Sequence, residues 1–300
     1  MTYVDFILNL ASLLLWLNWC SVGFDPLSKR TPATLMGTLR PAAPKKLQRW
    51  HLLLFIAALL LLRAIFYWQI GAALSPIWTG KLDLGVIELS FRSDWFGRIL
   101  LFSLLSFLRV LGLFYIGLLF LSLLKGPEPF HRLVRIPLGW VDGWARWQKM
   151  LLPLLGTAVL WLLSGWALTA MQISPPPVSV AHRLEQALII GLNSYLVWQF
   201  PAVAMLGLHL LNSYIYFGKH PFWNYVNATA QLLLSPLKRI PLRLGKMDFA
   251  PLVGIILVFL LVHLVENGVK TPVRTGEHRQ ALPPLINLPG LVDLYGKLPL

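Results

Sequence analysis

Long apolar blocks, rather than short amphipathic patterns, run along most of this sequence. About 20 consecutive apolar residues are needed for a helix to span the hydrocarbon layer of a bilayer. The third and fifth blocks are longer than this, so we expect both to tilt or kink, and Pro201 marks the expected bend in the fifth. The blocks predict six transmembrane helices, near residues 4–23, 52–73, 95–124, 150–171, 187–217 and 249–266.

Composition agrees with this pattern and narrows the chemistry. Of the 300 residues, 57% are hydrophobic and only 13% are charged, which excludes a water-soluble protein. Cys20 is the single cysteine. An intrachain disulfide, a Cys-x-x-Cys redox pair and a Cys-x-x-Cys-His haem attachment are therefore excluded.

The basic residues indicate the orientation of the chain. Three of the five connections between spans carry 16 of the 26 lysines and arginines. By the positive-inside rule these three connections are cytoplasmic, and both termini face out. The formal charge of +14 then reflects topology and attraction to anionic headgroups, which is favoured over nucleic-acid binding.

An internal repeat gives the expected organisation. GPEPFHRLV at 126–134 matches GKHPFWNYV at 218–226, and PLLG at 153–156 matches PLVG at 251–254. Both copies begin outside and turn at the cytoplasm, so they are parallel repeats. We predict an all-α membrane protein built as helical hairpins with amphipathic cytoplasmic connections. Its parts are an N-terminal two-helix hairpin with an outer loop (1–94), a first repeat (95–171), a second repeat (184–266) and a proline-rich external tail (267–300).

The cytoplasmic connections have the features of membrane-surface segments. FWNYVNATAQLLL places four side chains on one helical face, namely Phe222, Val226, Thr229 and Leu233. Pro236 and Pro241 then break the helix. The basic residues that follow are expected to bind lipid phosphates or an acidic partner; they are Lys238, Arg239 and Arg243. In the first copy a tryptophan stripe is expected at the same depth, formed by Trp140, Trp144 and Trp147.

The second copy resembles the YggT family, called YlmG in cyanobacteria and plastids. The residues that fill its motif in order are Pro236, Leu237, Lys238, Arg239, Ile240, Pro241, Gly245, Asp248 and Pro251. Ser235 and Ala250 depart from it, where Asp and Ser are usual. The resemblance covers roughly residues 95–266, and the first copy keeps only its Pro-Phe turn and Pro-Leu-x-Gly.

The resemblance implies a non-catalytic integral membrane protein, because the family has no established catalytic activity. Its members are associated with cell division, nucleoid or plastid organisation, osmotic tolerance and cofactor assembly on a photosynthetic cytochrome. We therefore expect a scaffold or assembly factor with a membrane-protein partner. The alternatives are a small-ion transporter or channel, for which Asn193, Gln199 and Asn212 supply polar groups, and a structural subunit of a larger complex.

Two arginines lie within spans, where a polar group is a functional candidate. Arg63 and Arg109 sit near the middle of the second and third spans, with no acidic residue expected at matching depth. Each is expected to snorkel or to bond backbone oxygens, and the rival reading is an anion or headgroup site. Between the two, Arg109 is favoured because it falls within the repeat.

Two histidines could hold a haem between adjacent helices. His209 and His263, however, differ in predicted depth by roughly 8 Å, so we expect neither haem nor another cofactor nor a metal. His263 is expected to pair with Glu266, one turn away. The sequence contains no Ser-His-Asp set, His-Glu-x-x-His or phosphate-binding glycine loop, and we expect no enzyme.

Asp248 and the outer segments complete the expectations. Asp248 lies three residues before Pro251, at the N-terminal end of the last span, where it would cap the helix or, as the alternative, coordinate an ion. The alternation of Leu82, Leu84 and Val86 predicts a short strand. The tail is expected to dock against residues 81–91 on the outer face.

Overall fold

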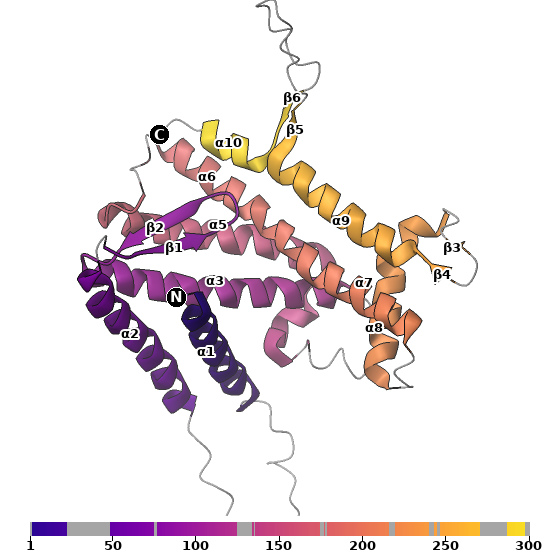
Figure 1. Cartoon of the computed structure of the whole chain (residues 1–300), viewed down its shortest axis with the longest axis horizontal. Helices are drawn as coiled ribbons and strands as arrows, with labels where there is room; N and C mark the ends of the chain where they lie inside the picture. Colours follow the sequence, from indigo (N-terminus) through magenta and orange to yellow (C-terminus); the bar gives the residue numbers. More distant parts are fainter. Residues whose placement is uncertain are drawn as a thin grey trace, which may run out of the picture. The chain divides into compact units, whose positions relative to one another are not determined.

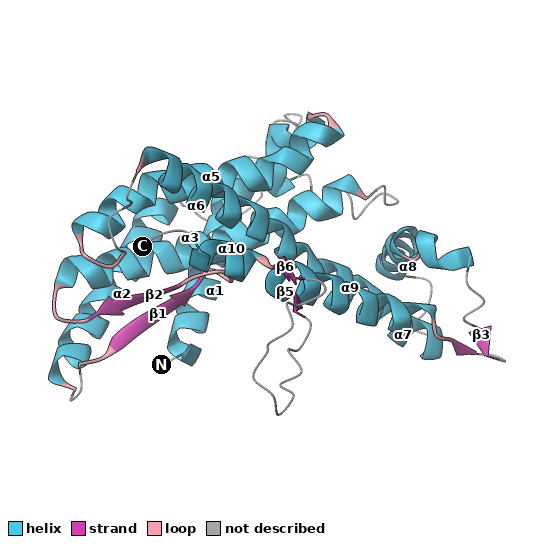
Figure 2. Ribbon diagram, turned by 90° about the horizontal axis from the view of Figure 1, so that it is seen from above, coloured by secondary structure: helices cyan, strands magenta, loops and turns pink. Residues whose placement is uncertain are grey.

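The structure is a computed structural model, and it describes residues 2–22, 49–74, 77–124, 134, 136–174, 177, 179–215, 220–239, 243–244, 247–270 and 287–297. Figure 2 shows that these residues are mostly helical, with strands only in short pairs. The chain divides into two compact units, which are described separately.

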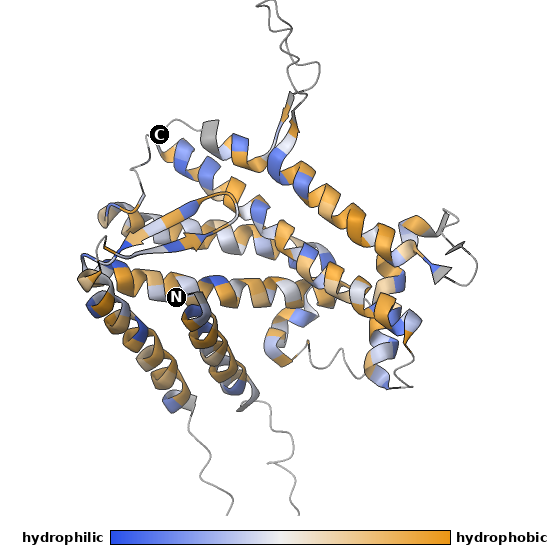
Figure 3. Ribbon diagram, viewed as in Figure 1, coloured by the Kyte–Doolittle hydropathy of each residue, from blue (hydrophilic) through white to orange (hydrophobic). Residues whose placement is uncertain are grey.

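Six helices of the described part are long and apolar enough to cross a membrane. Figure 3 shows the apolar residues running along most of their length, for example on α9 (Ala250–Asn267). The chain is therefore an all-α multi-pass membrane protein, as its apolar blocks predict. The six spans are Tyr3–Ser21, Trp50–Ala73, Phe96–Leu123, Arg146–Ala170, Val180–Tyr214 and Ala250–Asn267.

The first unit contains the N-terminal helices and comprises Met1–Leu82, Ser90–Gly112 and Arg135–Gly139. Helix α1 (Thr2–Val22) packs against α2 (Arg49–Ala73), and the first part of α3 (Phe96–Leu123) belongs to the same unit. The boundary between the units falls within α3. The predicted first repeat, 95–171, is consequently divided between them.

A hairpin of two strands follows α2 (Figure 1). Strands β1 (Thr79–Asp83) and β2 (Glu88–Arg92) pair, and each alternates exposed and buried residues. The buried apolar side chains are Leu82, Leu89 and Phe91. The single strand predicted through Leu84 and Val86 is therefore wrong: these residues lie in the turn, where Gly85 has a φ of +89° that favours glycine.

The fifth span of the sequence, in the second unit, is interrupted. It consists of α6 (Val180–Asn193), the 3₁₀ helix η3 (Ser194–Trp198) and α7 (Gln199–Tyr214). Pro201 lacks an N–H, and its ring clashes with the carbonyl four residues earlier, at Val197, if the α-helix continues. The interruption just before Pro201 agrees with the bend predicted there.

Helix α5 (Arg146–Ala170) packs closely against α6. A Cβ placed on Gly191 would lie 2.9 Å from the Leu154 carbonyl oxygen, so the two backbones approach each other at this point. One turn further on, the Tyr195 hydroxyl donates to the Met150 carbonyl oxygen over 2.6 Å. A glycine is thus required where the two helices cross.

Helix α9 packs instead against α7, the second α-helix of the interrupted fifth span (Figure 1). A Cβ on Gly254 would lie 2.9 Å from Leu234 Cδ2 and 3.3 Å from Leu206 Cδ1. These leucines belong to a buried cluster with Ala230 and Leu237. By contrast, a Cβ on Gly156 would meet nothing within 4 Å. The glycines of the two Pro-Leu-x-Gly motifs therefore have different surroundings.

The connection before α9 contains α8 (Pro221–Leu233), η4 (Ser235–Arg239), β3 (Arg243–Leu244) and β4 (Met247–Asp248). The predicted helix over FWNYVNATAQLLL is confirmed. Of the four residues predicted to share a face, Val226 and Thr229 are buried together with Tyr225 and Ala230, whereas Phe222 and Leu233 are only partly buried. Burial raises the pKa of the Tyr225 hydroxyl above its usual value.

The described part of the tail folds back onto the second unit. Strand β5 (Gly268–Lys270) pairs antiparallel with β6 (Asn287–Pro289), and α10 (Leu291–Lys297) follows. Helix α10 makes its main contacts with α9 and α6 rather than with residues 81–91, where docking was predicted.

Candidate functional site

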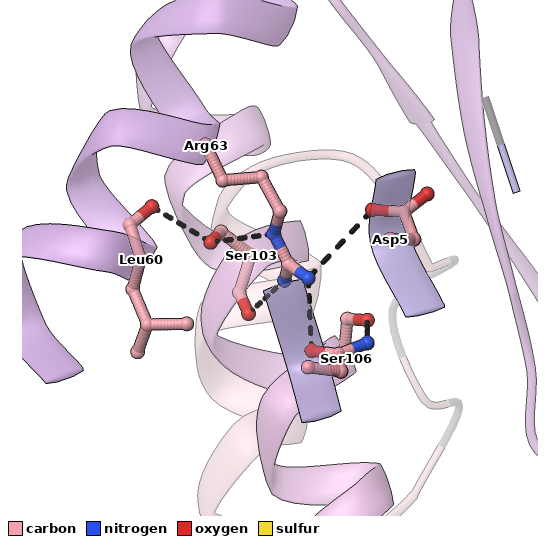
Figure 4. A network of polar contacts seen from close by, with 6 residues as sticks. Asp5, Leu60, Arg63, Ser103 and Ser106 are labelled. Carbon is pink, nitrogen blue, oxygen red and sulfur yellow. Dashed lines mark hydrogen bonds and ion pairs between the residues drawn. The ribbon is translucent and has the colours of Figure 1, made fainter. Parts of the chain in front are cut away.

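A network of polar side chains joins α1, α2 and α3 around Arg63 (Figure 4). Arg63 comes from the apolar helix α2, yet its side chain is only 1% exposed. Its Nε donates to Ser103 Oγ over 3.0 Å, and its Nη2 donates to the Ser103 carbonyl oxygen. Its Nη1 donates to Asn9 Oδ1 over 2.9 Å and lies 3.6 Å from Asp5 Oδ1. Every nitrogen of the guanidinium therefore has a partner within the protein.

The partners of Arg63 are themselves held by further hydrogen bonds. The Ser103 hydroxyl donates to the Leu60 carbonyl oxygen over 2.8 Å, and Asn9 Nδ2 donates to Ser106 Oγ over 3.0 Å. The Arg63 Cζ atom also lies 5.7 Å from the centre of the Phe102 ring. Buried polar groups that satisfy one another in this way fix the mutual position of the helices that carry them.

Two buried oxygens of the network have no hydrogen bond of standard geometry to the residues that the structure describes, although their side chains lie close enough to interact with each other. They are Oδ1 of Asp5, which has a 3.6 Å ion pair with Arg63, and the hydroxyl of Tyr67, one turn after Arg63 on α2. The Tyr67 ring stacks on Trp78, with ring centres 4.5 Å apart. Asp5 and Tyr67 therefore face each other within the network, beside Arg63.

This network corrects the expectation that no acidic residue faces a buried arginine. Asp5 is four residues into a long helix, so counting residues along the spans placed it near the surface, whereas the long arginine side chain covers the difference. The signal that was missed is the spacing of polar residues. Asp5, Asn9 and Ser12 recur on one face of α1, and Ser103 and Ser106 recur on α3. Arg109, the favoured candidate, is only partly buried.

A second, smaller polar cluster links α7 to α8. His209 Nδ1 donates to Asn227 Oδ1 over 2.8 Å, and Asn212 Nδ2 donates to the same oxygen over 3.2 Å.

His263 has a different partner: its Nδ1 accepts from Asn267 Nδ2 over 3.0 Å, so the predicted pairing with Glu266 is wrong. The amide lies one full turn along the helix, on the same face as the histidine. Within the described residues, no group of three or more His, Cys, Asp or Glu could hold a metal ion.

The polar residue Asn193 also has a defined role. Its Nδ2 donates to the Leu84 carbonyl oxygen over 2.6 Å, at the turn of the β1–β2 hairpin. The Gly85 N–H donates to Asp83 Oδ1 over 2.7 Å in the same turn. Asn193 and Asn212 are therefore both used in contacts within the protein.

Asp248 makes the contact expected of a helix cap. Its Oδ1 accepts a hydrogen bond of 3.0 Å from the Ala250 N–H, the first residue of α9. It does so from the position before the N-cap residue, which is Phe249. Asp248 is also the ladder partner of Arg243 in the β3–β4 pair. The side chains of Lys238, Arg239 and Arg243 lie outside the described part of the structure, so their predicted lipid contacts stay predictions.

We expect the Asp248→Ala variant to lose about 0.5 to 2 kcal/mol of stability, the usual effect of removing a cap. The measurement is thermal unfolding of the purified protein in detergent. The Asp248→Asn variant keeps an acceptor oxygen and should retain most of the stability. Equal losses in the two variants would show that the carboxylate charge, rather than the hydrogen bond, is what matters.

The tryptophans of the predicted stripe lie just before and within the first turn of α5. Trp140, in the 3₁₀ helix η2 (Gly139–Gly143), is 81% exposed and Trp147 is 63% exposed. Trp144 is partly buried, and its ring meets that of Trp140 edge to face, with centres 5.7 Å apart.

Comparison with known proteins adds no relative. No protein-family model matches this chain, and no curated protein or solved structure matches it either.

Proposed function

We propose that this protein is a non-catalytic membrane scaffold or assembly factor, of the type that its resemblance to the YggT family implies. The observation that carries the proposal is the way the buried polar side chains are used. Arg63, Asn9 and Ser103 tie three helices together, and His209 and Asn212 tie α7 to α8. Polar side chains that are hydrogen-bonded between helices in this way hold a framework in place, whereas a transporter needs polar groups that face a solute path.

The outer surfaces of the spans support contacts with partners. Among the six candidate spans, those of α1 and α9 bury the smallest share of their residues, 11% in each case. Apolar residues such as Phe6 on α1 and Leu260 on α9 are more than half exposed. Lipid and a membrane-protein partner are the occupants that we propose for these faces. The proposed location is a bacterial inner membrane, with both termini outside, and a plastid membrane is the alternative.

The test is purification in mild detergent combined with site-specific photo-crosslinking. A photoreactive residue at Leu260 or Phe6 should give a crosslinked band of discrete size, with the partner present in less than equimolar amount. The matched control is Leu168, which is fully buried on α5 and should give no such band. Partners in fixed stoichiometry would indicate a structural subunit instead, and no crosslinked protein from either site would contradict the proposal.

A small-ion transporter is the second candidate, and one observation favours it. Asp5 and Tyr67 are two ionisable residues that interact with each other and with Arg63 inside a region of apolar candidate spans. Fluxes of Na⁺, K⁺ and H⁺ into vesicles that contain the purified protein would decide between the two. A flux that the Tyr67→Phe variant abolishes would favour transport over the scaffold function.

A further inference from the structure

The segment from Trp140 to Trp147, which includes Arg146, will be called the tryptophan turn. It lies at the point where α5 begins and presents three indole rings and one guanidinium group. Trp140, Trp147 and Arg146 are exposed, and Trp144 packs edge to face against Trp140. Large exposed aromatic side chains of this kind are typical of binding surfaces.

An ion pair and a hydrogen bond at the start of α5 hold the tryptophan turn in a fixed shape. Lys149 Nζ lies 3.2 Å from Asp142 Oδ1, and the two side chains are only 8% and 12% exposed. The Ala145 N–H donates to Gln148 Oε1 over 3.0 Å at the start of α5. The ion pair joins the middle of the turn to the first turn of the helix. The indoles are therefore presented by a preorganised segment, and little conformational entropy is lost when they bind.

The neighbouring residues indicate what covers this surface. Directly after the turn, the exposed side chains of α5 are apolar, with Met150, Leu151 and Leu155 each more than 40% exposed. These belong to a candidate membrane span, so their exposed side chains would face hydrocarbon in a bilayer. Tryptophan is enriched where hydrocarbon gives way to headgroups, because one edge of the indole is apolar and the N–H is polar.

Charge agrees with a phospholipid surface. Lys149 neutralises Asp142 in the buried pair, so Arg146 supplies the exposed charge of the turn. A guanidinium group presents paired N–H donors that match the oxygens of a phosphate. A cation flanked by indoles at the end of a span fits the phosphate layer of a bilayer.

We propose that the tryptophan turn is a headgroup anchor: Trp140 and Trp147 insert at the border of the hydrocarbon, and Arg146 binds lipid phosphate. The anchor fixes the depth at which α5 sits in the bilayer. It does not depend on the scaffold function, since it would serve a transporter or a structural subunit equally well.

The experiment measures the depth of the turn with a spin label. In a Cys20→Ala background, Gly143→Cys places a nitroxide inside the turn and leaves all the tryptophans unchanged. Gly143 is exposed, and a Cβ there would meet nothing within 4 Å, so the label fits without strain. The protein is reconstituted in vesicles of phosphatidylcholine with phosphatidylglycerol. Collisions with oxygen and with a water-soluble nickel chelate report the depth of the label.

We expect the label to lie at headgroup depth, accessible to both collision partners. The Trp140→Ala/Trp147→Ala double variant should move it into water, with a several-fold rise in nickel-chelate collisions. The matched control is a label at Gly156→Cys on α5, where a Cβ also meets nothing within 4 Å. That label should stay in hydrocarbon in both backgrounds, which shows that α5 remains inserted and folded.

Arg146 is tested separately through lipid composition. Raising the fraction of phosphatidylglycerol should draw the label at Gly143→Cys deeper, and the Arg146→Gln variant should lose this dependence. The anchor would be overturned if the label already lies in water in the unchanged turn, or if its depth is the same with and without the two tryptophan substitutions. A label hidden from oxygen and nickel alike would also overturn it, because the turn would then be covered by protein. A lipid dependence that survives Arg146→Gln would overturn the phosphate contact.

Discussion

Replacing Arg63 with leucine should lower the free energy of unfolding by about 3 kcal/mol, because Asp5 is then left without its cation in a mostly buried position. Asn9 and the Ser103 hydroxyl also lose their donor. The loss falls on the contacts that hold α1 to α2 and α3, so α1 should become accessible to protease before the rest of its unit. Thermal unfolding in detergent, followed by limited proteolysis, measures both effects.

The double variant Asp5→Leu/Arg63→Leu should recover much of this stability, since replacing both members of a buried ion pair by apolar residues is often neutral. The Arg98→Leu variant is the matched control. Arg98 also pairs with an aspartate, Asp94, over 2.8 Å, but this pair is more exposed and links residues four apart on one segment. Its loss should cost less than about 1 kcal/mol. Equal effects at Arg63 and Arg98, or no recovery in the double variant, would contradict a structural role for the buried network.

Replacing Gly191 with leucine should separate α5 from α6, with a loss of about 3 kcal/mol, at the upper end for overpacked sites. Even a methyl group at this position would lie 2.9 Å from a backbone carbonyl oxygen, and a backbone cannot move aside as a side-chain tip can. The hydrogen bond from Tyr195 to Met150 should be lost as the helices move apart. Thermal unfolding gives the stability, and crosslinking between the two helices gives the distance.

The Gly207→Leu variant provides the matched control for Gly191. Both glycines lie in the same span, yet a Cβ on Gly207 meets nothing within 4 Å. Leucine also forms helix more readily than glycine, by up to about 1 kcal/mol, so this variant should be neutral or slightly stabilised. A similar loss in the two variants would mean that leucine disturbs the span itself, and the close crossing at Gly191 would not be the cause.

The sequence was sufficient for the spans, because length and hydrophobicity determine which segments enter a bilayer. It was also sufficient for the interruption near Pro201, because proline cannot continue the hydrogen bonding of an α-helix. The helix α8 was predictable for a similar reason, since its apolar residues recur with helical spacing. Contacts between helices were harder to predict. Asp5 and Arg63 are far apart in the sequence, and only the packing of α1 on α2 brings them together. A residue count along each span gives the depth of a Cα atom, not that of a long side chain.

The repeat shows a second limit of sequence reasoning. Gly156 and Gly254 occupy equivalent places in the two Pro-Leu-x-Gly motifs, which predicts equivalent surroundings. Gly254 nevertheless faces Leu206 and Leu234, whereas Gly156 faces open space. A short motif records the local backbone, while the segment that packs against it is chosen by the rest of the chain. The motif alone therefore does not predict that α5 packs against α6 whereas α9 packs against α7, further along the same span.

That order has a consequence for the bilayer. Helix α5 contacts the interrupted span Val180–Tyr214 at Gly191, and α9 contacts the same span at Leu206. The two contacts are 15 residues apart, which corresponds to roughly 20 Å at 1.5 Å per residue. The span that carries both contacts has 35 residues and would be about 50 Å long at 1.5 Å per residue, so a flat hydrocarbon layer of about 30 Å can match it only if the span leans, bends or projects from the layer. Any residual mismatch deforms the surrounding lipid, at a cost of a fraction of a kcal/mol per Å. Membrane thickness thus becomes a variable that sets the resting tilt of this protein and favours some lipid environments over others.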